Sequence, residues 1–190
     1  MLLLVGLGNP GSNYTNTRHN IGFKIIDAIN AHFKLSKQKP KFKGLLTTGN
    51  IDEKKIYAIK PLTFMNNSGT AIKELIDYFK IDAKDVFVFH DDLDIDFGKI
   101  KAKFGGSSAG HNGIESIDKF IGKDYSRVRI GIGHPKTKKK VNNHVLEDFK
   151  EDEEEKINDI TGNIVEQLPT LIEKKIDLFS SKVNQDLNGI

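Results

Sequence analysis

Apolar positions along the chain follow two spacings, which divide it into strands and helices. Continuous apolar runs at residues 2–5 and 86–89 are typical of strands buried on both faces, and residues 128–132 indicate a further strand. Between these runs, apolar side chains recur every three or four positions. This spacing predicts amphipathic helices that begin near residues 21, 71 and 114. Thr17 or Asn20 is expected to cap the first of them.

A β-hairpin is predicted between the first two helices. Two apolar segments, 45–51 and 56–59, flank the charged stretch 52–55. Pro61 follows and is expected to end the regular pairing, because proline has no backbone N–H to donate.

The last third of the chain changes character twice. Residues 136–150 predict an exposed, mobile basic loop and a short helical return to the body near Val145 and Phe149. Residues 151–190 have helical apolar spacing, and the helix is expected to kink or split at Pro169.

Strands that alternate with helices favour an α/β fold. We expect a single domain, residues 1–190, with a mixed but mostly parallel twisted sheet and helices on both faces. Ligands bind such sheets beyond the carboxyl ends of the strands. This rule gathers the polar residues that follow the predicted strands, the methionine beside one of them, and one residue at the start of the first helix: Asn9, Met65, Asn66, Asp91, His134 and His19.

Composition narrows the function classes. The chain has no cysteine, which excludes disulfides, thiol nucleophiles and zinc-thiolate sites and fits a cytoplasmic protein. Its N-terminal apolar run lacks a basic segment and is soon ended by glycines, so it is interpreted as a strand and no membrane association is expected. Residues 1–150 carry 25 Lys and Arg against 16 Asp and Glu, whereas residues 151–190 carry 4 against 10. The net charges are therefore +9 and −6, and the basic body suits a polyanionic partner.

A glycine-rich stretch at residues 104–113 stands out within the basic body. Lysines alternate with apolar residues just before it, and His111 and Asn112 end it near a predicted helix N-terminus, where unpaired amides favour negative charge. Both an anion-binding loop and an ordinary turn after a solvated lysine face fit this pattern.

Water is the expected nucleophile if the chain is a hydrolase. The sequence has neither cysteine nor a Gly-x-Ser-x-Gly elbow. His19 with Asp91 supplies a base whose tautomer a carboxylate would hold, and asparagine amides are available for a developing oxyanion. Structural roles fit the same residues: His19 as partner of a nearby group, Asp91 bonded to a turn amide, Asn9 in an Asx turn, and Asn66 as a helix cap.

Six segments together resemble bacterial peptidyl-tRNA hydrolases, with matching order and spacing through residues 1–150. They are residues 6–11, 17–22, 61–69, 90–94, 110–113 and 127–133. The resemblance implies a monomeric esterase that needs no metal or other cofactor. It would cleave the bond between a peptide and the 3'-terminal ribose of tRNA, and so recycle peptidyl-tRNA released from ribosomes.

The resemblance also implies roles for individual residues. His19 would be the general base and Asp91 its orienting carboxylate. Substrate would contact Asn9, Tyr14, Met65, Asn66, His111 and Asn112, while Lys103 and Arg129 would bind phosphates of the tRNA acceptor stem. Two positions depart from the family pattern: Ala109 replaces a usual glycine, and His144 stands where an aromatic residue is expected.

Two other functions remain open at this stage. One is a non-catalytic RNA-binding protein on the same scaffold. The other is a metal-dependent phosphoester hydrolase that uses His90, Asp91, Asp92, Asp94 and His111. Against the second, Asp91 and Asp92 are adjacent and would point apart on a strand.

Overall fold

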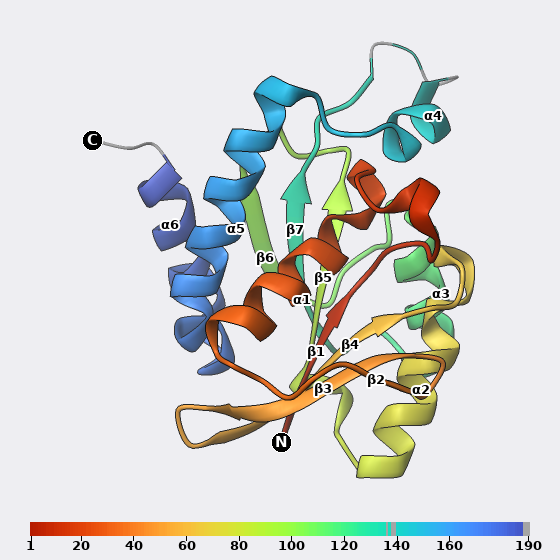
Figure 1. Ribbon diagram of the computed structural model, residues 1–190, viewed down its shortest axis with the longest axis vertical. Coiled ribbons are helices and arrows are strands. Elements are labelled where there is room, and N and C mark those ends of the chain that lie inside the picture. Colours follow the sequence, from red (N-terminus) through yellow and green to blue (C-terminus); the bar gives the residue numbers. More distant parts are fainter. Residues whose placement is uncertain (136, 138–139, 188–190) are drawn as a thin grey trace.

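The chain folds around one seven-stranded sheet. A computed structural model describes residues 1–135, 137 and 140–187. The sheet has the order β2-β3-β4-β1-β5-β7-β6 (Figure 1). Its strands are β1 (Leu2–Gly6), β2 (Lys39–Lys41), β3 (Gly44–Ile51), β4 (Lys54–Pro61), β5 (Val86–Asp92), β6 (Ile100–Phe104) and β7 (Ser126–Gly131). The central strands β4, β1, β5 and β7 are parallel, whereas β2, β3 and β6 join through antiparallel pairings. The α/β class and the mixed sheet are confirmed, with the parallel pairings confined to its centre.

Helices cover both faces of this sheet, as predicted. Figure 1 shows α1 (Ile21–His32), α5 (Glu151–Ile172) and α6 (Ile176–Leu187) on one face, and α2 (Ser68–Phe79) and α3 (Asn112–Ile121) on the other. The short α4 (Val141–Leu146) lies at the end of the sheet to which β5 and β7 point. Within the described residues, no helix has the length and apolarity to cross a membrane.

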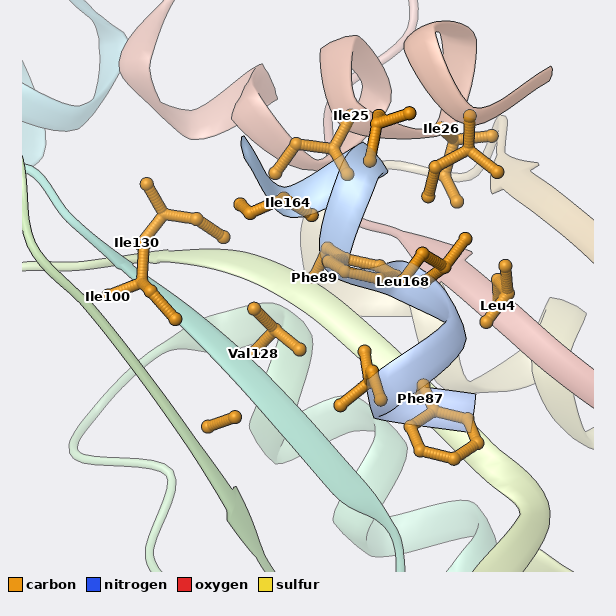
Figure 2. Close-up of a cluster of buried hydrophobic side chains, with 14 of the residues drawn as sticks. Leu4, Ile25, Ile26, Phe87, Phe89, Ile100, Val128, Ile130, Ile164 and Leu168 are labelled. Atoms are coloured by element: carbon orange, nitrogen blue, oxygen red, sulfur yellow. The ribbon is translucent and has the colours of Figure 1, made fainter. Parts of the chain in front are cut away.

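The apolar run of β1 packs on both sides. Leu2 and Leu4 belong to one hydrophobic cluster, Leu3 and Val5 to the other. Figure 2 shows the first cluster, in which Ile25, Ile26, Ile164 and Leu168 of α1 and α5 lie on Leu4, Phe87, Phe89 and Val128 of the sheet. Burial of each apolar side chain of this size stabilises the folded state by about 1.5–3 kcal/mol. Continuous apolar strands therefore follow from a sheet covered on both faces.

Two glycines set α1 against the sheet. A Cβ on Gly22 would meet the Leu7 N and the Phe89 O, and a Cβ on Gly6 would meet the Gly22 O. Only glycine permits this close approach. The consequence is that the turn just before α1 lies beside the carboxyl end of β5.

Some local predictions were wrong. Of the kink or split expected at Pro169, the split is absent: α5 continues to Ile172, and the chain turns through Lys174, whose φ is 64°. Neither expected cap forms, because Thr17 Oγ1 donates to the Tyr14 O and the Asn20 side chain bonds the backbone of Asn9.

Other outcomes concern the hairpin and the basic loop. The hairpin is present as β3 and β4, although its turn is shorter than the charged stretch. The edge strand β2 was not predicted. The short helical return is confirmed as α4, whereas Lys136, Lys138 and Lys139 of the predicted mobile loop lie outside the described residues.

Candidate active site

A buried carboxylate organises the residues at the carboxyl end of the sheet. Asp91 lies near the end of β5, and His19 lies in the short 3-10 turn Arg18–Asn20 that precedes α1. The His19 Nδ1 is 2.9 Å from Asp91 Oδ1 and 2.8 Å from Oδ2. Because Nδ1–H donates to the carboxylate, the neutral ring carries its lone pair on Nε2. The histidine can therefore accept a proton on the side away from Asp91.

A second imidazole contacts the same carboxylate. The His111 Nε2 lies 2.9 Å from Asp91 Oδ1. The opposite nitrogen, Nδ1, accepts hydrogen bonds from the backbone N–H groups of Gly113 and Ile114, at 3.1 and 3.3 Å, and so caps α3. These two N–H groups fix the tautomer of His111, whose proton must be on Nε2. Asp91 therefore receives a hydrogen bond from each ring.

The charges of this cluster shift its pKa values. Burial lowers the pKa of His19, but the charge and hydrogen bond of Asp91 outweigh it, and the pKa is raised above its ordinary value of 6.5. Burial raises the pKa of Asp91, yet His19 and His111 together hold it well below its usual range. Asp91 is therefore ionised whenever His19 is neutral, and it favours the protonated form of His19.

A third histidine lies behind this pair. His90 is buried, and its Nδ1–H donates to the Asp91 O at 2.7 Å. Its ring meets that of His111 edge-on, with centroids 4.9 Å apart. Burial, reinforced by the proximity of His111, lowers the pKa of His90 to about 3. His90 is consequently a neutral support for the end of β5.

Two cavities open beside His19. The loop-side cavity, of about 280 Å³, is lined by residues 91–94, residues 108–112, His19, His134, Val141, Asn142 and Val145. The amide-side cavity, of about 320 Å³, is lined by Asn9, His19, Phe64, Met65, Asn66, Asn112, Asn142, Val145 and Leu146. Four residues border both cavities: His19, Asn112, Asn142 and Val145.

Hydrogen bonds fix the Asn9 amide in the amide-side cavity. Asn9 lines this cavity, and its Oδ1 accepts from the Met65 N at 2.8 Å, while its NH₂ group has no partner among the described residues and is available to a ligand. The Asn20 side chain holds the Asn9 backbone through two bonds of 2.9 Å. Glycine is needed at position 113 for Met65 to pack against the start of α3, because a Cβ there would meet Met65 Sδ.

The remaining predicted contact residues lie around these cavities. Tyr14 meets Phe64 edge-on at 6.5 Å but lines neither of the two cavities. Lys103 lies against Gly106 of the glycine-rich loop, whose φ is 109°. The Arg129 Nε donates to Asp92 Oδ2 at 2.7 Å, so this arginine is held at the rim of the loop-side cavity.

Both departures from the family pattern have a local structural counterpart. Ala109 has a φ of 49°, a conformation that glycine adopts at lower cost. The His144 Nε2–H donates to the Ile132 O at 3.1 Å, which ties α4 to the end of β7.

Two features escaped the sequence analysis: the residues that α4 contributes to the cavities, and the contacts of Arg18. Val145 of α4 was expected only as part of the short helical return and Asn142 was not singled out, since a six-residue helix shows too little periodicity to identify a face. Arg18 was overlooked although it precedes His19. Its side chain is 3% exposed and reaches residues more than 120 positions away.

The cluster also has ligand types that metals use. Ligand atoms of His19, Asp91 and His111 lie within 4.8 Å of one another. The His111 tautomer speaks against a metal there, because Nε2 is protonated while Nδ1 accepts two amides. Asp91 and Asp92 also turn to different partners, His19 and Arg129, as expected for neighbours on a strand. Of the ligands proposed for the metal-dependent alternative, His111 is therefore engaged with backbone amides and Asp92 with Arg129.

Comparisons with known proteins agree with this geometry. The chain matches the family profile described as peptidyl-tRNA hydrolase over residues 3–189. The peptidyl-tRNA hydrolase of Pelagibacter ubique is 73% identical over 97% of this chain and 99% of that protein. That of Ehrlichia ruminantium is 47% identical over 95% of this chain and 93% of that protein. A crystal structure of peptidyl-tRNA hydrolase from Acinetobacter baumannii is similar, with a TM-score of 0.91 and 34% identity over 97% of this chain and 94% of that chain. The chain therefore belongs to the peptidyl-tRNA hydrolase family.

Proposed function

We propose that His19 and Asp91 activate the water with which this peptidyl-tRNA hydrolase cleaves the ester between the peptide and the 3'-terminal ribose of tRNA. One observation carries the proposal. The buried Asp91 fixes the Nδ1–H of His19 at 2.8–2.9 Å, while His19 borders both cavities. A histidine so held presents Nε2 as a base.

The reaction has two proton transfers through His19. Nε2 takes a proton from water as the water oxygen bonds to the ester carbonyl carbon. Asp91 stabilises the imidazolium that forms. The tetrahedral intermediate then breaks its bond to the ribose O3', and the imidazolium returns its proton to that oxygen. The products are a peptide carboxylic acid and tRNA with a free 3' end.

Neutral amides would stabilise the oxyanion and bind the peptide. The NH₂ group of Asn9 is directed by its bond from Met65, and Asn66 and Asn112 line the same cavity. Donors aimed at a developing oxyanion lower the barrier without adding charge. Phe64 and Met65 would contact an apolar side chain of the peptide. The amide-side cavity therefore takes the peptide.

The loop-side cavity would take the 3' end of the tRNA. Asp92 lines this cavity and holds Arg129, and Lys103 lies against the adjoining glycine-rich loop. These cations would bind acceptor-stem phosphates, a role that is sensitive to salt. We propose further that the enzyme works as a cytoplasmic monomer and returns dropped tRNA to translation.

A binding protein without catalysis is the competing function. It has no need of a buried carboxylate that orients a histidine between two cavities, so the His19–Asp91 pair favours the enzyme. The test is to incubate the protein with an N-blocked aminoacyl-tRNA and with the unblocked form, and to follow tRNA release.

We expect fast release from the blocked substrate and slow release from the unblocked one. A free α-ammonium would lose its hydration in an amide-lined cavity that offers no carboxylate to pair with it. Binding without release from either substrate would contradict the proposed function.

A further inference from the structure

The helix α4 brings one unassigned polar side chain, that of Asn142, to the edge of both cavities. Asn142 borders both cavities, as do His19 and Asn112. The Asn142 amide makes no hydrogen bond to any other residue that the structure describes. An amide at the junction of two cavities, beside the base, is placed to contact the substrate where its two halves meet.

The geometry points to a specific partner: we propose that Asn142 recognises the 2'-hydroxyl of the terminal ribose. This inference rests on the proposed function of His19. The ester uses O3', and the 2'-hydroxyl is attached to the neighbouring carbon, so it lies at the same junction. A hydroxyl both donates and accepts, and an amide does the same without placing a charge beside His19. The contact would separate a ribose end from a deoxyribose end.

The position of α4 depends on Arg18. The helix α4 has no buried residue, and packing holds it only through partly buried side chains such as Val145. Arg18 Nη1 instead donates to the His144 O and the Glu147 O at 3.3 and 3.4 Å, and the Arg18 backbone N donates to the Glu147 O at 3.0 Å. The Nη2 of the same side chain pairs with Glu153 Oε2 at 2.9 Å.

Arg18 is therefore a positioning residue that links two parts of the site. It precedes His19 in the chain and binds the carbonyls at the carboxyl end of α4. Through these bonds the histidine and the Asn142 amide are held in one geometry. A lysine carries the charge but lacks the planar fork that serves two carbonyls and a carboxylate together.

The test combines an enzyme variant with a substrate variant. Asn142→Ala and wild type are assayed for kcat/KM on an N-blocked aminoacyl minihelix that ends in adenosine, and on the same minihelix ending in 2'-deoxyadenosine. A hydrogen bond between neutral groups is worth roughly fivefold to tenfold in kcat/KM. We expect wild type to lose this factor on the deoxy substrate. Asn142→Ala should show the same reduction in kcat/KM on the ribose substrate, and its kcat/KM values on the ribose and deoxyribose substrates should be equal.

Asn143→Ala is the matched control, because Asn143 is exposed on the same helix and lines neither cavity. It should retain wild-type discrimination. If Asn142→Ala discriminates between the two sugars as well as wild type does, the proposal is overturned. His19→Ala, by contrast, should be slow on both substrates. A His19→Ala enzyme with wild-type rates would contradict the proposed function, whereas unchanged sugar discrimination in Asn142→Ala would contradict only the role of Asn142.

The positioning role has its own measurement. Arg18→Lys should reduce the preference for ribose, and combining it with Asn142→Ala should add no further loss of that preference. A slow but fully ribose-selective Arg18→Lys enzyme would contradict the link between Arg18 and Asn142. Arg18→Gln provides a second variant, and circular dichroism of both confirms the fold.

Discussion

The imidazoles of His19 and His111 share one oxygen of Asp91. Each places a ring nitrogen 2.9 Å from Oδ1, and the ring centroids lie 4.9 Å apart. The backbone amides of α3 hold His111 in a single tautomer, so this ring cannot release the carboxylate by turning over. Asp91 is therefore fixed from one side while it orients His19 on the other.

We expect His19→Ala to abolish turnover and to leave tRNA affinity nearly unchanged. The variant removes the proposed base but keeps the cations proposed to bind phosphate, and general-base help is worth roughly 100-fold to 10,000-fold in rate. Asp91→Asn should also be slow, because an amide cannot stabilise the imidazolium. Single-turnover rates and filter binding separate the two effects. Wild-type turnover in His19→Ala would remove this histidine from the mechanism.

The activity should fall on the acid side with an apparent pKa above 6.5. Asp91 raises the pKa of His19, and only the unprotonated ring accepts a proton from water. The rate should therefore rise as the pH passes upward through this raised value. A profile of kcat/KM against pH gives the free-enzyme value. An acid limb centred below 6.5 would show that another group controls the reaction.

The buried His90 should make the protein less stable in mild acid. In the unfolded chain His90 takes a proton near 6.5, whereas in the folded protein its pKa is about 3. Between these values the unfolded state binds more protons, so the free energy of unfolding falls as the pH falls, by about 1.4 kcal/mol per pH unit for one such group. The raised pKa of His19 acts mainly above 6.5 and does not cancel this effect.

Urea unfolding of wild type and His90→Asn at pH 7 and pH 5 measures how much His90 contributes to the pH dependence of the free energy of unfolding. Asparagine can still donate to the Asp91 O, but it has no proton to gain in this range. The variant should lose less stability than wild type between the two pH values. Equal losses would assign the acid sensitivity to other groups.

Lys103→Ala and Arg129→Ala should raise KM for full-length substrate more than they lower kcat. Each lost phosphate contact should flatten the slope of log affinity against log salt by about 0.9 in the duplex limit. Lys73→Ala is a suitable control, because this lysine lies exposed on α2 and pairs with Asp77. A substrate without the acceptor stem should be cleaved equally well by all three variants. Poor cleavage of that substrate would place Lys103 or Arg129 in the chemical site.

The sequence predicted those features that depend on long, regular patterns. Buried runs such as residues 86–89 identified the strands, and the rule for parallel sheets brought His19 near Asp91. Short elements escaped because they carry almost no pattern. The strand β2 has three exposed residues, Lys39, Pro40 and Lys41, and is specified only by its pairing with β3.

Other features depend on contacts that no local pattern records. The tautomer of His111 follows from two backbone N–H groups, and the role of Asn20 follows from its bonds to Asn9. The Arg18 contacts join positions far apart in the chain. At Pro169 the expected split did not form, because proline disrupts only one turn and five buried apolar residues of α5, including Leu168 and Leu171, lie beyond residue 160 on the packed face.

The ion pairs of Arg18 and Lys24 with α5 join one of the first segments of the chain to be synthesised with one of the last. Arg18 pairs with Glu153 and Lys24 with Glu154, each at 2.9 Å. The histidine turn is among the first segments that a ribosome synthesises, yet the acidic residues that anchor it arrive more than 120 residues later. A nascent chain that stops before α5 therefore contains His19, Asp91 and His111 but lacks the two glutamates that pair with Arg18 and Lys24. The ion pairs of Arg18 and Lys24 with α5 can therefore form only after residues 153 and 154 have been synthesised.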